Sequence, residues 1–380
     1  MAPGEAVALT IWSISVLALC IVLAYASWRL VRSRNMQYWL GSYVAWKWAA
    51  LFRRRPPCRH VYFCFADHYE PYGGGADRAR ARARVAQWTR QYPAVAARHQ
   101  DSFGNHPKHT FFYPAEEYDP ELLDQIKQLC ARGLGDVEVH LHHDNDTAEN
   151  FRRVIGEYTN TLHERHGLLR KDPVTGKVLY CFIHGNWALD NSRPDGRWCG
   201  VDNEIDILVE TGCCADMTMP SAPSDTQTRK INSIYFSRGR PGRRKSHDTG
   251  RDVRAGRWGD AGELLLIQGP LTLNWKDAKL GVLPRIESAE LSRDAPPTPH
   301  RARLWADCGI CVKGAEEHVF VKVHTHGATE ESMQMLFAEN GFERLWSELE
   351  RLYRRDDGGT LRYVTAWEMY AKIRELAIGR

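Results

Sequence analysis

The feature that most constrains the fold is a repeated alternation of short apolar runs with longer helix-like segments beyond Pro57. Residues 60–68 read HVYFCFADH, residues 109–114 read HTFFYP and residues 178–185 read VLYCFIHG, and each run has polar residues at its end or just beyond it. Between them lie segments typical of helices, such as residues 119–133, which begin with acidic residues and end at a glycine. Repeated units of this kind predict a mostly parallel sheet covered by helices.

About seven strand–helix units of this kind fit an α/β fold with a distorted (β/α)7–8 barrel, in which reactive residues lie at the carboxyl ends of the strands. Further strands are predicted over residues 136–143, 213–220, 233–236, 263–270 and 319–327. Helices are predicted over residues 76–100 as far as Pro93, and over 147–167, 202–210, 302–312, 329–339, 342–354 and 364–376.

An apolar segment precedes this pattern. From Ala6 to Trp28 the chain carries no charged residue, and this run exceeds the roughly 20 residues needed to cross a hydrocarbon layer. No basic segment precedes the run and it is too long for a cleaved signal, so we expect a single-pass anchor. Arg29, Arg32 and Arg34 follow at once, and the positive-inside rule then places the rest of the chain on the cytoplasmic side.

Aromatic residues cluster directly after these arginines, which suits a helix lying in the headgroup layer. We therefore expect residues 1–56 to form the membrane anchor, in contact with lipid, and residues 57–380 to form one β/α-barrel domain. The alternative, a second short span that returns the domain to the other side, is disfavoured by three arginines at the far end. The aromatic residues are Tyr38, Trp39, Tyr43, Trp46 and Trp48, and the arginines are Arg53, Arg54 and Arg55.

The distribution of charge excludes one class of partner. The net charge is +4, but residues 1–55 contribute +6, so the rest of the chain is slightly acidic. No nucleic acid is expected as a partner, because a nucleic-acid-binding domain would be strongly basic. Residues 238–257 are locally rich in arginine and glycine and predict a long mobile loop, either solvated or in contact with anionic substrate or lipid headgroups.

Polar side chains gather at four predicted strand ends. Because strand side chains alternate, His140 and His142 point the same way, as do His324 and His326. Neutral imidazoles and carboxylates are ligands of divalent cations, so the pattern predicts a metal site, with Zn²⁺ the favoured ion. The four groups are Asp67, His68 and Glu70; His140, His142, His143 and Asp144; His184, Asn186, Trp187 and Asp190; and His324 with His326.

Three protein ligands with one open position define a catalytic metal site, where the ion activates water and polarises a carbonyl. A nearby carboxylate can take the proton of that water, and an imidazole can protonate the leaving group. Such a site hydrolyses amides and esters.

The motifs FADHY, VHLHHD and VKVHTHG resemble those of the glycoside hydrolase/deacetylase β/α-barrel superfamily, which includes NodB-type polysaccharide deacetylases and YdjC-type carbohydrate deacetylases. The resemblance covers roughly residues 60–330. It implies that Asp67 is the catalytic base, that His68 and His140 bind the metal, and that His324 is the general acid. If Asp67 is a ligand instead, Glu70 would have to serve as the base.

Two departures from the family pattern leave roles open. Asp144 stands where the NodB type has a second histidine, so the third ligand is one of His142, His143 and Asp144. The third family motif is replaced by HGNWALDNS, which implies a different substrate-binding wall. We expect that wall to contain His184, Asn186, Asp190 and Trp187, together with Glu70 and His326; Trp187 would stack on a sugar or else belong to the core.

The sequence therefore predicts a membrane-anchored, metal-dependent hydrolase that removes an acyl group from a saccharide or glycoconjugate by N- or O-deacetylation. One alternative is a glycosidase, which would pair Asp67 with Asp190 or Glu204. The other is a catalytically degenerate glycan-binding scaffold in a polysaccharide-biosynthesis complex.

Overall fold

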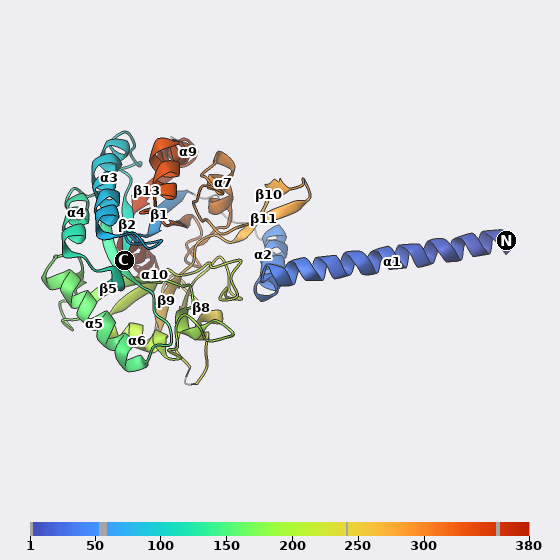
Figure 1. Ribbon diagram of the computed structural model, residues 1–380, viewed down its shortest axis with the longest axis horizontal. Helices are drawn as coiled ribbons and strands as arrows, with labels where there is room; N and C mark the ends of the chain where they lie inside the picture. Colours follow the sequence, from blue (N-terminus) through green and yellow to red (C-terminus); the bar gives the residue numbers. More distant parts are fainter. Residues whose placement is uncertain (1–2, 53–58, 241, 355–357, 380) are drawn as a thin grey trace.

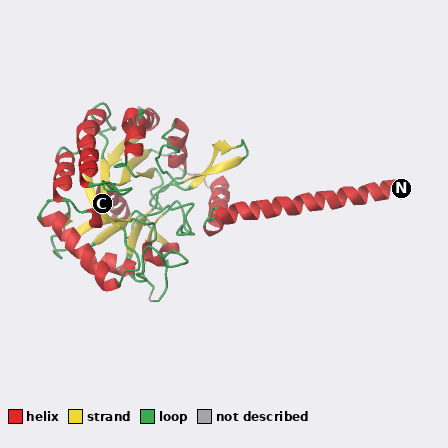
Figure 2. Cartoon of the chain, viewed as in Figure 1, coloured by secondary structure: helices red, strands yellow, loops and turns green. Residues whose placement is uncertain are grey.

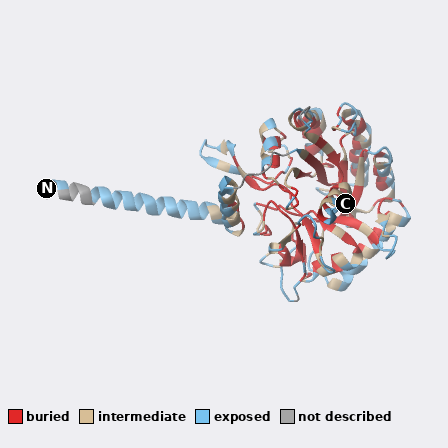
Figure 3. Ribbon diagram, turned by 180° about the vertical axis from the view of Figure 1, so that it is seen from behind, coloured by how far each residue is buried: buried red, intermediate tan, exposed pale blue. Residues whose placement is uncertain are grey.

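The computed structural model describes residues 3–52, 59–240, 242–354 and 358–379. Its main body is a mixed α/β structure in which strands lie inside and helices surround them (Figure 2). Helix α1 (Pro3–Ser33) extends away from this body (Figure 1). Figure 3 shows that most of α1 is exposed where its burial is described, whereas the strands of the body are mostly buried.

A large sheet of eleven strands forms the centre of the body, in the order β12-β1-β2-β3-β5-β6-β9-β7-β8. The pairs from β12 to β9 are parallel, whereas β7 is antiparallel to β9 and to β8. Strand β13 also pairs with β1, β4 pairs with β5, and β10 and β11 form a separate hairpin. The strands are β1 (His60–His68), β2 (His109–Pro114), β3 (Gly135–Leu141), β4 (Arg170–Lys171), β5 (Val178–His184), β6 (Cys213–Asp216), β7 (Ile234–Ser237), β8 (Arg251–Asp252), β9 (Leu264–Ile267), β10 (Thr272–Lys279), β11 (Leu283–Glu287), β12 (His318–Thr325) and β13 (Thr360–Val364).

The predicted α/β class is confirmed, but a closed barrel is not shown. Among the described residues no hydrogen-bonded ladder joins β12 to β8, the two ends of the sheet. The outer edge of β12 is covered by a loop instead, because His324 N donates to Ala289 O and Leu291 N donates to His324 O. The structure therefore shows a large, mostly parallel sheet, without a closed ladder among the described residues.

Helices begin where polar residues satisfy the free backbone N–H groups of the first turn. The Asp77 side chain accepts from Arg80 N at the start of α3, and Thr147 accepts from Asn150 N at the start of α5. The remaining helices are α2 (Leu40–Phe52), α4 (Pro120–Ala131), α6 (Glu204–Thr211), α7 (Pro299–Asp307), α8 (Glu330–Met333), α9 (Gly341–Tyr353) and α10 (Ala366–Ile378), beside α3 (Arg78–Ala96) and α5 (Ala148–Glu164).

Helix α3 differs from its prediction, because it continues through Pro93 to Ala96. The proline lies close to the end of the helix and is buried in the core. Packing there offsets the single backbone hydrogen bond that a proline removes.

Alternation along β1 sorts its side chains between two cores. Phe63 and Phe65 belong to the core that includes Trp88 of α3, whereas Cys64 and Ala66 belong to a second core formed with other strands. Successive strand residues point to opposite faces, so Asp67 and His68 at the end of β1 cannot serve the same site.

The segment after α1 was predicted to lie in the headgroup layer. In the structure part of it packs against the body instead. Trp39 is fully buried and Tyr43 nearly so, in a third core that contains Leu271. Other aromatic and apolar side chains of α2, such as Trp48 and Phe52, are exposed. The predicted arginines Arg53, Arg54 and Arg55 lie outside the described residues.

The basic segment 238–257 is more ordered than predicted. It contains β8 and a short helical turn at Ser246–Asp248. Ser246 and His247 are buried, and Ser246 N donates to Asp190 Oδ2 at 2.6 Å. This buried hydrogen bond links the segment to the body, so the segment is not wholly a loop.

Helix α1 is long and apolar enough to cross a membrane. The candidate span is Ile11–Ser33, with a mean hydropathy of 2.0, and it overlaps the predicted span over residues 6–28. A signal sequence near an N-terminus satisfies the same criteria of length and composition.

Docking of the segment after α1 can be tested with two tryptophans. We expect Trp39→Ala to lower the free energy of unfolding by about 3–5 kcal/mol, because it leaves a cavity in the third core. Trp48→Ala is the matched control; Trp48 is 65% exposed, so we expect a change within about 0.5 kcal/mol. Denaturant unfolding of the full chain in detergent measures both, and equal effects would show that Trp39 is not buried.

Candidate metal centre

The carboxyl ends of β1, β3 and β12 bring several imidazoles together around one carboxylate. The ring centroid of His68 lies 4.8 Å from that of His140, 4.9 Å from that of His326 and 6.1 Å from that of His324. The rings of His140 and His142 are 4.7 Å apart. We call this group the strand-end cluster; it consists of His68, Glu70, His140, His142, His324 and His326.

Glu70 lies at the centre of the strand-end cluster. Its Oε1 is 3.2 Å from His140 Nε2 and 3.5 Å from His142 Nε2, and its Oε2 is 3.5 Å from His326 Nδ1. Two sets of three possible ligands share Glu70, one with His140 and His142 and the other with His68 and His326. Within each set the ligand atoms lie within 4.8 Å of one another.

The outer nitrogens of two imidazoles are already bonded to oxygen. His140 Nδ1 lies 2.9 Å from the carbonyl of Ile183, and His142 Nδ1 lies 2.5 Å from Glu116 Oε1. A neutral ring that donates from Nδ1 has a lone pair on Nε2. The Nε2 lone pairs of His140 and His142 then both face Glu70 Oε1. Because all three atoms are acceptors, a proton or a cation must lie between them. Metal-binding histidines in proteins usually donate their other ring N–H to a carbonyl or carboxylate oxygen, as these two Nδ1 atoms do.

His68 is a buried base without a partner. Its side chain is 1% exposed, and Nδ1 has no hydrogen-bond partner among the described residues. Burial first, and then the neighbouring imidazoles, hold the pKa of His68 well below its ordinary value. The ring is therefore neutral at pH 7 and available as a ligand.

The charges in the cluster depend on Glu70. Burial would raise its pKa, but hydrogen bonds from His140 and His326 hold that pKa below its ordinary value. Burial likewise opposes charge on His326 and His142, yet Glu70 and, for His142, Glu116 raise their pKa values above the usual one. The carboxylate of Glu70 therefore favours the charged form of the two partly exposed imidazoles, His142 and His326.

One side of the cluster faces solvent. The side chains of His142, His326 and Glu116 are 31%, 34% and 35% exposed, whereas those of His68 and His140 are buried. The ring of Trp187 lies 5.4 Å from that of His68 and 6.0 Å from that of His326.

Backbone strain accompanies the position of Trp187. Its φ of 54° lies in the left-handed region, as do those of Asp190 and Asn191 in the same loop. Non-glycine residues rarely adopt this conformation, and they do so more often at functional sites. The strained loop places an aromatic wall beside the open side of the cluster.

Asp67, the predicted base, is not part of the cluster. Its carboxylate is fully buried on the opposite face of β1, where Oδ2 lies 2.8 Å from His109 Nε2 and Oδ1 accepts from Gly327 N at 2.6 Å. These contacts join β1 to β2 and to the turn after β12. The structure thus gives Asp67 a structural position and places Glu70 among the imidazoles.

His324, the predicted general acid, lies at the buried edge of the cluster and is 6% exposed. Burial first, and then the charges of Lys322, His326 and Arg301, hold its pKa well below the ordinary value. A proton on this ring is unfavourable at pH 7, so His326 is the better placed donor.

Four other predicted site residues lie elsewhere. Asp144 is exposed, and its carboxylate accepts from Trp198 N at 2.5 Å. His184 and Asp190 are fully buried and so cannot touch a substrate, while Asn186 is half-buried beside them. Of the three candidates for the third ligand, only His142 contacts Glu70.

Sequence reasoning missed Glu116. This residue follows β2 directly, in the short helical turn Ala115–Glu117, and bonds both His142 Nδ1 and His142 N. The signal was present, because two glutamates come immediately after the strand over residues 109–114.

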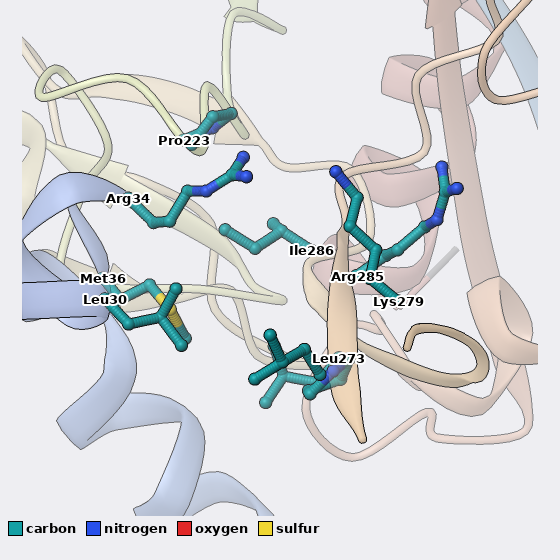
Figure 4. Close-up of a pocket in the computed structure, with 10 residues that line it drawn as sticks. Leu30, Arg34, Met36, Pro223, Leu273, Lys279, Arg285 and Ile286 are labelled. Carbon is teal, nitrogen blue, oxygen red and sulfur yellow. The ribbon is translucent and has the colours of Figure 1, made fainter. Parts of the chain in front are cut away.

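A separate pocket lies far from this cluster in the sequence, between the end of α1 and the β10–β11 hairpin. Figure 4 shows cationic side chains of Arg34, Lys279 and Arg285 around an apolar floor. The apolar side chains that line it include Leu30, Met36, Leu273 and Ile286.

The fold and the site together define a mixed α/β protein with a candidate metal centre at the carboxyl ends of parallel strands. No model of a known protein family matches the chain, and a search of curated proteins gave no significant match.

The structural position of Asp67 can be tested by removing its charge. We expect Asp67→Asn to lower the free energy of unfolding by about 1–3 kcal/mol, because a buried hydrogen-bond partner is lost, and to leave metal binding unchanged. Asp294→Asn, at an exposed position, is the control and should have little effect on stability. A lower metal content in Asp67→Asn than in the wild type, without loss of stability, would contradict this position.

Proposed function

We propose that the protein is a metal-dependent hydrolase that removes an acyl group from a saccharide or glycoconjugate. The observation that carries the proposal is the carboxylate of Glu70 between the Nε2 atoms of His140 and His142, whose outer nitrogens are both bonded to oxygen. The choice of an acyl group as the group removed, and of a saccharide as the substrate, rests on the resemblance of the strand-end motifs to those of the carbohydrate deacetylases.

The residues present fit a zinc ion. Two imidazole nitrogens and one carboxylate oxygen are the ligand set of many catalytic zinc sites, and Glu70, His140 and His142 supply it. When bound, such an ion polarises an acyl carbonyl and lowers the pKa of water. The exposed sides of His142 and His326 leave room for the substrate beside these ligands.

The protein's own acid–base group in this proposal is His326. Its Nδ1 faces Glu70 Oε2, and Glu70 raises its pKa. A ring that holds a proton can deliver it to the departing nitrogen or oxygen, and the proton that the attacking water releases then restores the ring. The acyl–nitrogen or acyl–oxygen bond breaks, and the products are a free carboxylic acid and an amine or alcohol.

Trp187 is the candidate sugar-binding residue. Its half-buried ring lies beside His68 and His326, on the open side of the cluster. A flat aromatic face there would stack on a pyranose ring and orient its acyl group toward Glu70.

No observation favours the glycosidase alternative. A glycosidase needs two carboxyl groups about 5–10 Å apart across the substrate. Asp67, Asp190 and Glu204, which would supply them, are all fully buried. The degenerate scaffold makes a different prediction, a folded protein that binds no metal.

We also propose that α1 anchors the domain to a membrane, with the domain on the cytoplasmic side. Exposed apolar side chains of α2 and of the β10–β11 hairpin lie near the end of α1, among them Trp48 (65% exposed) and Leu280 (91%). Arg34, Lys279 and Arg285 beside them suit anionic headgroups. Lipid would cover apolar surface that the body leaves exposed.

Substitution at the centre of the cluster tests the proposed chemistry. We expect Glu70→Gln and His140→Ala each to lose bound zinc and to lower acetate release from N-acetylated oligosaccharides by at least about 100-fold. His300→Ala, a half-buried histidine on α7, is the control and should keep both properties. Zinc is measured by elemental analysis and acetate by a coupled assay.

Two outcomes of the same assay would contradict the proposal. Full acetate release by His140→Ala would show that the cluster does not carry the reaction. New reducing ends without acetate would assign the protein to the glycosidases.

The anchor is tested on the full chain in cells. We expect the protein in the membrane fraction with an intact mass that retains residues 1–33, and a fluorescent reporter at the C-terminus should be active only on the cytoplasmic side. A mass that corresponds to loss of the N-terminal helix would identify a cleaved signal sequence and contradict the anchor.

A further inference from the structure

A second group of potential ligands lies behind the strand-end cluster and is buried. His143 follows β3, His184 ends β5, Cys199 lies in the loop before α6, and Glu204 is the first residue of α6. The side chains of His184, Cys199 and Glu204 are fully buried, and that of His143 is 7% exposed. We call these four residues the buried His–Cys–Glu group.

The four ligand atoms converge. Glu204 Oε1 lies 3.3 Å from His143 Nε2 and 3.8 Å from His184 Nε2, and Glu204 Oε2 lies 3.4 Å from Cys199 Sγ. All four atoms are within 4.8 Å of one another. Three segments of the chain, at His143, at His184 and at residues 199–204, therefore meet at one point.

His143 has the outer partner of a metal ligand. Its Nδ1 lies 3.1 Å from Asp146 Oδ2, and Asp146 is itself held by Thr147 N and Asn150 Nδ2, both at 2.7 Å. A carboxylate that accepts from one ring nitrogen directs the lone pair of the other nitrogen inward. For His143 that lone pair faces Glu204.

His184 supplies an independent observation. Its Nε2 is fully buried, points toward Glu204 and has no hydrogen-bond partner among the described residues. An unpaired buried polar atom costs free energy. A protonated His143 between Asp146 and Glu204 would satisfy those three residues without a metal, but it would leave His184 Nε2 without a partner.

We propose that His143, His184, Cys199 and Glu204 bind a zinc ion in a closed, four-coordinate structural site. Two nitrogens, one sulfur and one carboxylate oxygen suit tetrahedral zinc, and burial leaves no position for substrate. Binding through Nε2 moves the proton of His184 to Nδ1, so the long 3.3 Å contact of that atom with Asn186 N is exchanged for the metal bond.

This site would hold in place the loop that carries Trp187, the aromatic residue beside the strand-end cluster. The loop between β5 and α6 carries Trp187 and the strained Asp190, and Asp190 N donates to Glu204 Oε2 at 2.6 Å. A metal bound to His184 at one end of the loop and to Cys199 and Glu204 at the other would close the loop on itself. Trp187 would then be held beside His68.

The experiment uses zinc and cobalt with the full chain. Cys199 is the only thiol in either cluster, so cobalt bound at the buried group gives a thiolate-to-cobalt charge-transfer band that the strand-end cluster cannot give. We expect this band in the wild type and in Glu70→Gln, and we expect Cys199→Ser to lose the band and one equivalent of zinc per chain. Cys213→Ser, at a buried thiol on β6, is the control and should keep both.

The outcomes separate this site from the proposed function. A charge-transfer band in a protein that hydrolyses no saccharide would support the buried site alone. Absence of the band from the folded wild-type protein after cobalt loading would overturn the proposal, and so would an unchanged zinc content in Cys199→Ser. The charge-transfer band is measured on the wild-type protein, so this test does not depend on whether a variant folds.

Discussion

The ionised carboxylate of Glu70 is the interaction on which the strand-end site depends. It is mostly buried, and the two imidazoles nearest Oε1 have their outer nitrogens engaged by Ile183 O and Glu116. Acceptors that face one another in a buried site repel unless a positive charge lies between them. A proton or a divalent cation satisfies this requirement. Because the side toward His142 and His326 is open to solvent, a cation bound there would also be accessible to a substrate.

Much of the fold could be predicted from the sequence, because apolar strands and capped helices have local signals. The strands over residues 60–68 and 109–114 and the helix over 119–133 lie within two residues of their predicted bounds. The hairpin β10–β11 and strand β13 were not predicted; β10 and β11 carry several exposed polar residues, so no apolar run marks them. Closure of the sheet depends on contacts between distant strands, which local patterns do not specify.

The site was predictable only in part. Three of the four strand ends that carry histidines, those of β1, β3 and β12, do converge, as expected for parallel strands. The resemblance placed Asp67 and His68 in one site, although alternation along β1 sends adjacent side chains to opposite faces. Glu116 directly follows a predicted strand, so its place at the strand ends had a signal in the sequence. Cys199 is brought into place by tertiary packing and stands in no histidine motif, so the sequence alone could not assign it to a cluster.

The two clusters meet at the end of β3, since His140 and His142 belong to the strand-end cluster and His143 belongs to the buried His–Cys–Glu group. The most direct measurement is anomalous scattering at the zinc absorption edge from crystals of the full chain grown with zinc. We expect a peak about 2.0–2.2 Å from Glu70 and from the Nε2 atoms of His140 and His142. A direct hydrogen bond between Glu70 and His140 at full occupancy, with no anomalous peak between them, would contradict a metal centre at the strand ends.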